Sequence, residues 1–137
     1  MRMAARGLAR VGAGADVVLT SPLPRASETA AILAEEIADV AAPQECEALA
    51  TGTGAGELLR QLQPWADVPR LMLVGHEPTL SDLVAVLLTG SPAGAYVEMK
   101  KGACALMNVG RLAPDGEASL RWLLPPRALR RAGAAGQ

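Results

Sequence analysis

The 137-residue sequence has no phenylalanine, a single histidine and only two cysteines. One histidine and two cysteines are too few for a structural zinc site, which typically takes about four such ligands. Cys46 and Cys104 lie far apart in a chain without a secretory signature, so a disulfide framework is not expected. Any reaction that needs two histidines cannot be completed by these residues alone.

The sequence also lacks an excess of charge of one sign and any long hydrophobic run. The sequence has 13 Lys and Arg residues and 14 Asp and Glu residues, so no excess of positive charge is available to bind nucleic acid or an anionic membrane. The apolar runs fall short of the roughly 20 residues that a membrane helix needs. Half of the residues are hydrophobic, enough for the core of one domain. We expect a single cytoplasmic domain that binds neither nucleic acid nor membranes.

Short apolar runs alternate with helical periodicity along the chain. Continuous apolar runs predict buried strands near 17–19 and 70–74, and spaced apolar residues predict helices over 3–11, 26–37, 57–63 and 80–89. The segments 103–109 and 119–124 are typical of a terminal strand pair, and the residues from 127 onward of a frayed tail. Alternating strands and helices followed by a hairpin predict a layered α/β domain with a mixed sheet.

The first strand is followed by Thr20-Ser21-Pro22-Leu23-Pro24-Arg25-Ala26. Ser21 suits a helix N-cap and Pro22 suits the first helical position. Free N–H groups, the positive end of the helix dipole and the Arg25 guanidinium together favour a phosphate-like anion, with Ser21 among its ligands. In the alternative interpretation, Arg25 only pairs with Glu28 across a solvated helix face.

The second junction is Val74-Gly75-His76-Glu77-Pro78-Thr79, where the single histidine follows a buried strand. Thr79 and Asp82 have the spacing of a capping box. Ligands of open α/β sheets bind beyond the carboxyl ends of the strands, which is where we expect both His76 and Arg25. Alternatively, His76 only satisfies helix-end groups. Glu77 is either a general acid or an acidic residue placed beside a helix N-terminus.

These two segments resemble motifs of the histidine phosphatase superfamily. Ser21-Pro22-Leu23-Pro24-Arg25-Ala26-Ser27-Glu28-Thr29-Ala30 resembles S-P-x-x-R-A-x-x-T-A, and Val74-Gly75-His76-Glu77-Pro78 resembles V-G-H-E/x-P. The segments Lys100-Lys101-Gly102-Ala103 and Leu120-Arg121-Trp122-Leu123-Leu124-Pro125-Pro126 are similar to the SixA-type phosphohistidine phosphatase branch. The resemblance extends from about Gly7 to Leu129.

The resemblance implies a three-layer α/β/α sandwich and phosphoryl transfer through a covalent phosphohistidine, without metal or cofactor. In that comparison Arg25 clamps phosphate oxygens and His76 stabilises charge on the transferring group. Such assistance fits the need of phosphoryl transfer for positioning and positive charge. The implied substrate is a phosphohistidine-bearing protein or a small phosphorylated molecule.

The sequence departs from the family pattern because it contains no R-H-G motif, which carries the family's nucleophilic histidine. We therefore expect residues 1–129 to form an N-terminally incomplete domain that lacks the family's first strand, with 130–137 as a flexible tail. Loss of that strand would leave backbone edges unpaired on its neighbours. Hydrolysis by these residues would then be impaired.

Two other functions stay open. One is a non-catalytic phosphate- or phosphoprotein-binding regulatory module. The other is a small-molecule phosphomonoesterase of the phosphoglycerate mutase-like branch, which the short region between Glu45 and Gly56 disfavours.

Overall fold

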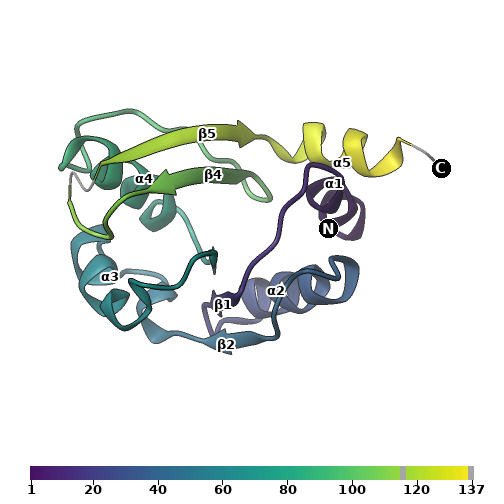
Figure 1. The fold of residues 1–137 in the computed structure, drawn as a ribbon, viewed down its shortest axis with the longest axis horizontal. Coiled ribbons are helices and arrows are strands. Elements are labelled where there is room, and N and C mark those ends of the chain that lie inside the picture. The colour runs from purple at the N-terminus through teal and green to yellow at the C-terminus, as the bar shows by residue number, and fades with distance from the viewer. Residues whose placement is uncertain (115–116, 136–137) are drawn as a thin grey trace.

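The computed structural model describes residues 1–114 and 117–135. Its elements, in chain order, are α1 (Arg2–Arg10), β1 (Val17–Thr20), α2 (Pro24–Glu36), β2 (Pro43–Glu45), η1 (Glu47–Leu49), α3 (Ala55–Gln61), η2 (Gln63–Trp65), β3 (Leu71–Val74), α4 (Thr79–Thr89), β4 (Cys104–Val109), β5 (Ala118–Leu124) and α5 (Pro126–Ala134). Figure 1 shows the helices around two separate groups of strands. None of the helices in these ranges is long and apolar enough to cross a membrane.

The first group is a parallel sheet in the order β2-β1-β3. Thr20 at the end of β1 lies opposite Glu45 of β2 and Val74 of β3, so the three strands end at one edge. The central strand is the apolar run that the sequence predicts, and its Val18 and Leu19 are fully buried. The second group is the antiparallel pair β4-β5, which confirms the predicted hairpin strands.

Two hydrophobic clusters show that the strands form the middle of three layers. Alternate residues of β3 face opposite clusters, as expected for a strand covered on both faces. Met72 and Val74 pack with core residues of α1, α2 and α5, whereas Leu71 and Leu73 pack with core residues of α3 and α4. The antiparallel pair contacts both clusters as well, so the predicted α/β/α sandwich is confirmed.

The predicted mixed sheet is divided into two sheets in the structure. Among the described residues, no ladder joins β3 to β4 or β5. In Figure 1, β4 lies on the side of β5 that faces the parallel sheet. All four apolar residues of β3 are partly exposed, in contrast to the fully buried pair in β1. β3 is therefore paired along one edge only, as expected for a sheet without the family's first strand.

Residues 130–134 form the second half of α5, so the prediction of a flexible tail from residue 130 is wrong for them. Residues 136 and 137 of that predicted tail lie outside the described residues. Helix α5 packs closely against α1, and Leu129 is fully buried between these helices and the sheet. The close approach is possible because Gly7 lies against the backbone of Leu129, and Gly133 against that of Met3.

One arginine ties together the amino-terminal edge of the parallel sheet. Arg70, just before β3, donates to Asp16 before β1 at 2.8 Å and to Asp39 before β2 at 2.6 Å. These hydrogen bonds, with the charge of Arg70, hold the pKa of both aspartates below the ordinary value. The three residues fix the loops through which the chain enters the sheet.

Replacing Arg70 with alanine is expected to destabilise the protein at pH 7 and to matter less at low pH. A carboxylate whose folded pKa is lowered adds stability above its unfolded pKa of about 4, and that stability is lost as pH falls through the folded pKa. Urea midpoints at pH 7 and pH 3 measure the difference. Arg60→Ala, which breaks the local ion pair with Glu57 in α3, should cost less. A cost of Arg70→Ala that is the same at both pH values would contradict this account.

Candidate phosphate-binding site

The first junction carries the chain from β1 into α2. Ser21 is fully buried, and its N–H donates to Val74 O at 2.8 Å, which continues the pairing of β1 with β3. The Ser21 hydroxyl oxygen accepts a hydrogen bond from Leu23 N at 3.2 Å. Helix α2 begins at Pro24 with Leu23 as its N-cap, so the prediction that Ser21 caps the helix is wrong by two residues. Ser21 instead holds the turn before it.

The second junction carries the chain from β3 into α4. Helix α4 begins at Thr79, as the sequence predicts within a residue, but Thr79 and Asp82 do not form a capping box. Glu77 Oε2 accepts the N–H of Ser81 at 3.0 Å, and the Thr79 hydroxyl donates to Thr53 O at 2.7 Å. Glu77 thus lies beside the N-terminus of α4, which is one of the two alternatives that the sequence leaves open for it.

The two junctions meet through one side-chain hydrogen bond. His76 Nε2 lies 2.9 Å from Ser21 Oγ, although 55 residues separate them in the sequence. The pairing of Thr20 with Val74 places both residues just beyond the carboxyl edge of neighbouring parallel strands. This edge is where open α/β sheets bind their ligands.

Arg25 lies in the first turn of α2, one turn beyond Ser21. Its side chain is exposed, and among the described residues no carboxylate is within ion-pair distance of it. The alternative pairing of Arg25 with Glu28 is therefore not found. An unpaired guanidinium beside a helix N-terminus leaves positive charge available to an anion.

A third segment, residues 46–54, also reaches this edge, which the sequence did not predict. A Cβ on Gly75 would lie 3.3 Å from the backbone oxygen of Leu49, so glycine permits the close approach of the two loops. Thr53 accepts the hydrogen bond from Thr79. The pattern Thr51-Gly52-Thr53-Gly54 marks a turn in the sequence, but its contact with the histidine loop depends on the fold.

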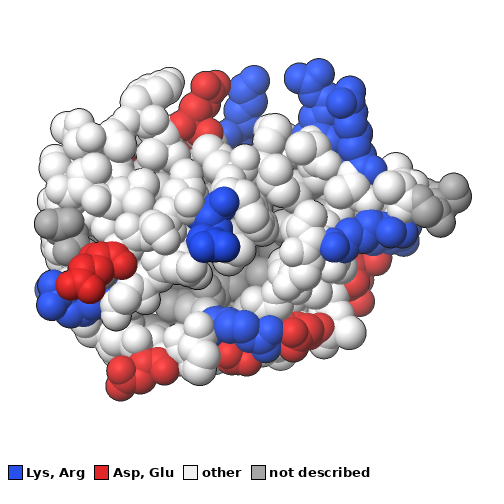
Figure 2. Space-filling model, turned by 45° about the horizontal axis from the view of Figure 1, so that its top comes forward, with Lys and Arg blue, Asp and Glu red and all other residues white. Residues whose placement is uncertain are grey.

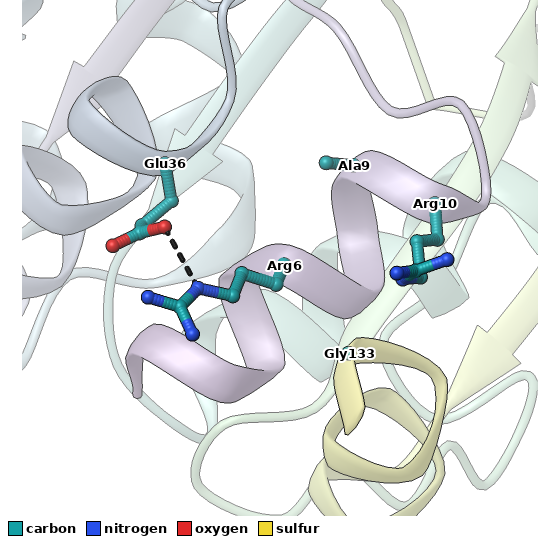
Figure 3. Close-up of a pocket in the computed structure, with 5 residues that line it drawn as sticks. All are labelled: Arg6, Ala9, Arg10, Glu36 and Gly133. Atoms are coloured by element: carbon teal, nitrogen blue, oxygen red, sulfur yellow. Dashed lines mark hydrogen bonds and ion pairs between the residues drawn. The ribbon is translucent and has the colours of Figure 1, made fainter. Parts of the chain in front are cut away.

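One hollow of the described surface lies away from the two junctions, among the helices α1, α2 and α5. Basic residues gather over α1 and α5, on the right side of Figure 2, where a shallow hollow is lined by Arg6, Ala9, Arg10, Glu36 and Gly133 (Figure 3). In that hollow Arg6 Nε lies 3.1 Å from Glu36 Oε2. In residues 1–114 and 117–135, no group of three or more His, Cys, Asp or Glu side chains is placed to hold a metal ion.

The chain is similar to a protein of known sequence and to a solved structure. The chain is 33% identical over 135 residues to an uncharacterized protein of Picosynechococcus sp. (strain PCC 7002), and the match covers 90% of this chain and 80% of that protein. The structure of the protein histidine phosphatase SixA complexed with tungstate is similar with a TM-score of 0.77 at 22% identity. That match covers 93% of this chain and 80% of the solved one. No protein-family model matches the chain.

Proposed function

We propose that this chain, which belongs to the same family as the Picosynechococcus protein and has a SixA-type histidine phosphatase fold, forms the phosphate-binding part of a phosphohistidine phosphatase site. The observation that carries the proposal is the hydrogen bond between His76 and Ser21, which joins the two motif segments at the carboxyl edge of the sheet. The tungstate in the SixA structure supports an oxyanion as ligand, since tungstate is a phosphate-like anion.

In this proposal the phosphoryl group lies beside the first turn of α2. Arg25 donates charge-assisted hydrogen bonds to its oxygens, and His76 donates an N–H to the oxygen where negative charge grows during transfer. Glu77 stays the candidate proton donor to the leaving group: Oε2 caps α4, and Oε1 has no hydrogen-bond partner among the described residues.

Hydrolysis by this route requires a nucleophilic histidine in addition to His76. That histidine attacks phosphorus, its new N–P bond replaces the bond to the leaving group, and water then releases phosphate and regenerates the imidazole. The 137 residues contain no second histidine. Cys104 does not replace it, because burial raises the pKa of its thiol to about 11 and keeps it protonated at neutral pH.

A strand that these 137 residues do not supply completes the domain in this proposal and carries the R-H-G nucleophile at its carboxyl end. The one-sided pairing of β3 and the partial exposure of its four apolar residues support this position. A parallel strand added there would gain backbone pairing along β3, and its carboxyl end would lie beside His76.

Two substrate classes remain within the proposal, a phosphohistidine-bearing protein and a small phosphorylated molecule. The fold similarity to a protein histidine phosphatase favours the first. If these residues act without a second histidine, the same site would bind phosphate without hydrolysing a phosphate ester or phosphohistidine. The exposed Arg25, which has no ion-pair partner among the described residues, suits such a binding module equally well.

Titration with inorganic phosphate or tungstate tests the binding site in the 137-residue protein. We expect saturable binding that Arg25→Ala weakens by about tenfold or more, because a charge-assisted hydrogen bond is lost. Arg130→Ala, which removes an exposed arginine of α5, is the matched control and should change the affinity by about twofold or less. Binding that is absent, or equal in the wild-type and Arg25→Ala proteins, would contradict the proposed site.

A further inference from the structure

The buried hydroxyl of Ser21 makes two hydrogen bonds, one of them with the ring of His76. Ser21 is fully buried, so its hydroxyl cannot turn to bulk water. Leu23 N–H already donates to the oxygen at 3.2 Å, and His76 Nε2 is the other partner at 2.9 Å. A hydroxyl has one proton to donate, and in the described part of the chain Ser21 Oγ makes no third hydrogen bond.

Only one tautomer of the neutral ring satisfies every group. If Nε2 carried the proton, Ser21 Oγ would accept from both Leu23 and His76, and its own buried proton would have no partner. If Nε2 is unprotonated, the Ser21 hydroxyl donates to it and accepts a hydrogen bond only from Leu23 N–H. Leaving a buried donor unpaired is the more costly arrangement. The backbone N–H of Leu23 therefore favours the orientation in which the Ser21 hydroxyl donates to His76. This donor in turn favours the ring tautomer whose Nε2 is unprotonated.

We propose that Ser21 is a positioning residue that holds neutral His76 as the Nδ1–H tautomer, so that Nδ1, and not Nε2, donates to the phosphate oxygen. Ser21 Oγ occupies Nε2, and no hydrogen bond to Nδ1 is found in the described part of the chain, which leaves Nδ1 as the ring nitrogen for a ligand. The contact with phosphate rests on the proposed function, whereas the tautomer of the free protein does not. Ser21 then acts through His76 and does not itself bind the anion.

The single histidine makes the test direct. Protein labelled with heavy nitrogen only in histidine gives ring signals from His76 alone. At about pH 8.5, proton–nitrogen correlation spectra distinguish the protonated from the unprotonated ring nitrogen of the neutral imidazole. We expect a bare Nε2 and a protonated Nδ1 in the free protein, and addition of inorganic phosphate should shift Nδ1 the more strongly.

Ser21→Ala should release the ring into a mixture of tautomers and weaken phosphate binding by about 3- to 10-fold, the worth of one neutral hydrogen bond. Thr20→Val is the matched control, because Thr20 is also buried but its hydroxyl donates to Ser21 O and makes no hydrogen bond with the ring. It should leave the tautomer and the affinity unchanged.

A protonated Nε2 in the free wild-type protein would overturn the inference, even if Ser21→Ala failed to fold. Saturable phosphate binding that shifts Nε2 more than Nδ1 would also overturn it, while leaving the proposed function intact. A fixed Nδ1–H tautomer without any response to phosphate would instead contradict the proposed function and uphold the role of Ser21 toward the ring.

Discussion

Replacing Gly7 with alanine is expected to lower the free energy of unfolding by about 3 kcal/mol or more, a large part of the stability of a small domain. A Cβ at Gly7 would lie 1.9 Å from the backbone oxygen of Leu129. No rotamer change relieves a clash with backbone, so α5 would have to move away from α1 and expose Leu129, which is fully buried. Gly133→Ala should act in the same way, because its Cβ would lie 1.9 Å from Met3 O.

The sign of this effect opposes helix propensity, which alone would make alanine better than glycine by up to about 1 kcal/mol. Gly56→Ala in α3 is the matched control, because nothing lies within 4 Å of a Cβ built there. It should raise stability by about 0.5–1 kcal/mol. Urea unfolding followed by circular dichroism measures all three variants. A Gly7→Ala protein as stable as the wild type would contradict the packing of α1 on α5.

The second large effect concerns turnover in a protein extended by an apolar strand that ends in Arg-His-Gly. In that protein His76→Ala should lower the rate of phosphohistidine hydrolysis by roughly 100-fold, the usual cost of removing one group that stabilises charge in the transition state. Release of phosphate from a phosphohistidine-bearing protein measures the rate.

Two controls separate the role of His76 from a loss of structure. The unfolding midpoint of the His76→Ala protein should stay close to that of the extended parent, because the ring is only partly buried. Replacing the added histidine should abolish turnover and leave phosphate binding in place. Turnover that His76→Ala leaves unchanged would refute the assigned role.

Apolar runs and helical periodicity in the sequence predict the strands and helices that carry the candidate site. The apolar runs at β1 and β3 and the periodicity of α2 and α4 are strong because each element is covered by a large core. The ends of the helices are less well predicted. Ser21 and Thr79 are good capping residues by type, yet the fold uses their hydroxyls for His76 and for Thr53.

The C-terminal helix α5 could not be predicted in full from local sequence. Residues 130–134 look like a tail because arginine, alanine and glycine carry little hydrophobic signal. Tertiary packing decides otherwise: Gly133 lets the helix backbone approach Met3, and Leu129 supplies the buried anchor. Such a helix is stabilised by its partner more than by its own periodicity.

The proximity of the two junctions could be predicted from the sequence. Parallel strands bring their carboxyl ends to one edge, so the order of elements places Ser21, with Arg25 one turn beyond it, at the same edge as His76. The hydrogen bond between His76 and Ser21 could not be predicted, because it depends on the register of β1 against β3. The contact of residues 49 and 53 with the second junction depends on the same register and on the path of a loop.

In the proposed function, these residues bind phosphate but need a second histidine to hydrolyse phosphohistidine. The most direct measurement compares phosphate release from a phosphohistidine-bearing protein by the 137-residue protein and by the protein extended with the Arg-His-Gly strand. We expect release only from the extended protein, with saturable phosphate binding by both. Equal release by the 137-residue protein, or a folded, phosphate-binding extended protein without activity, would contradict the account.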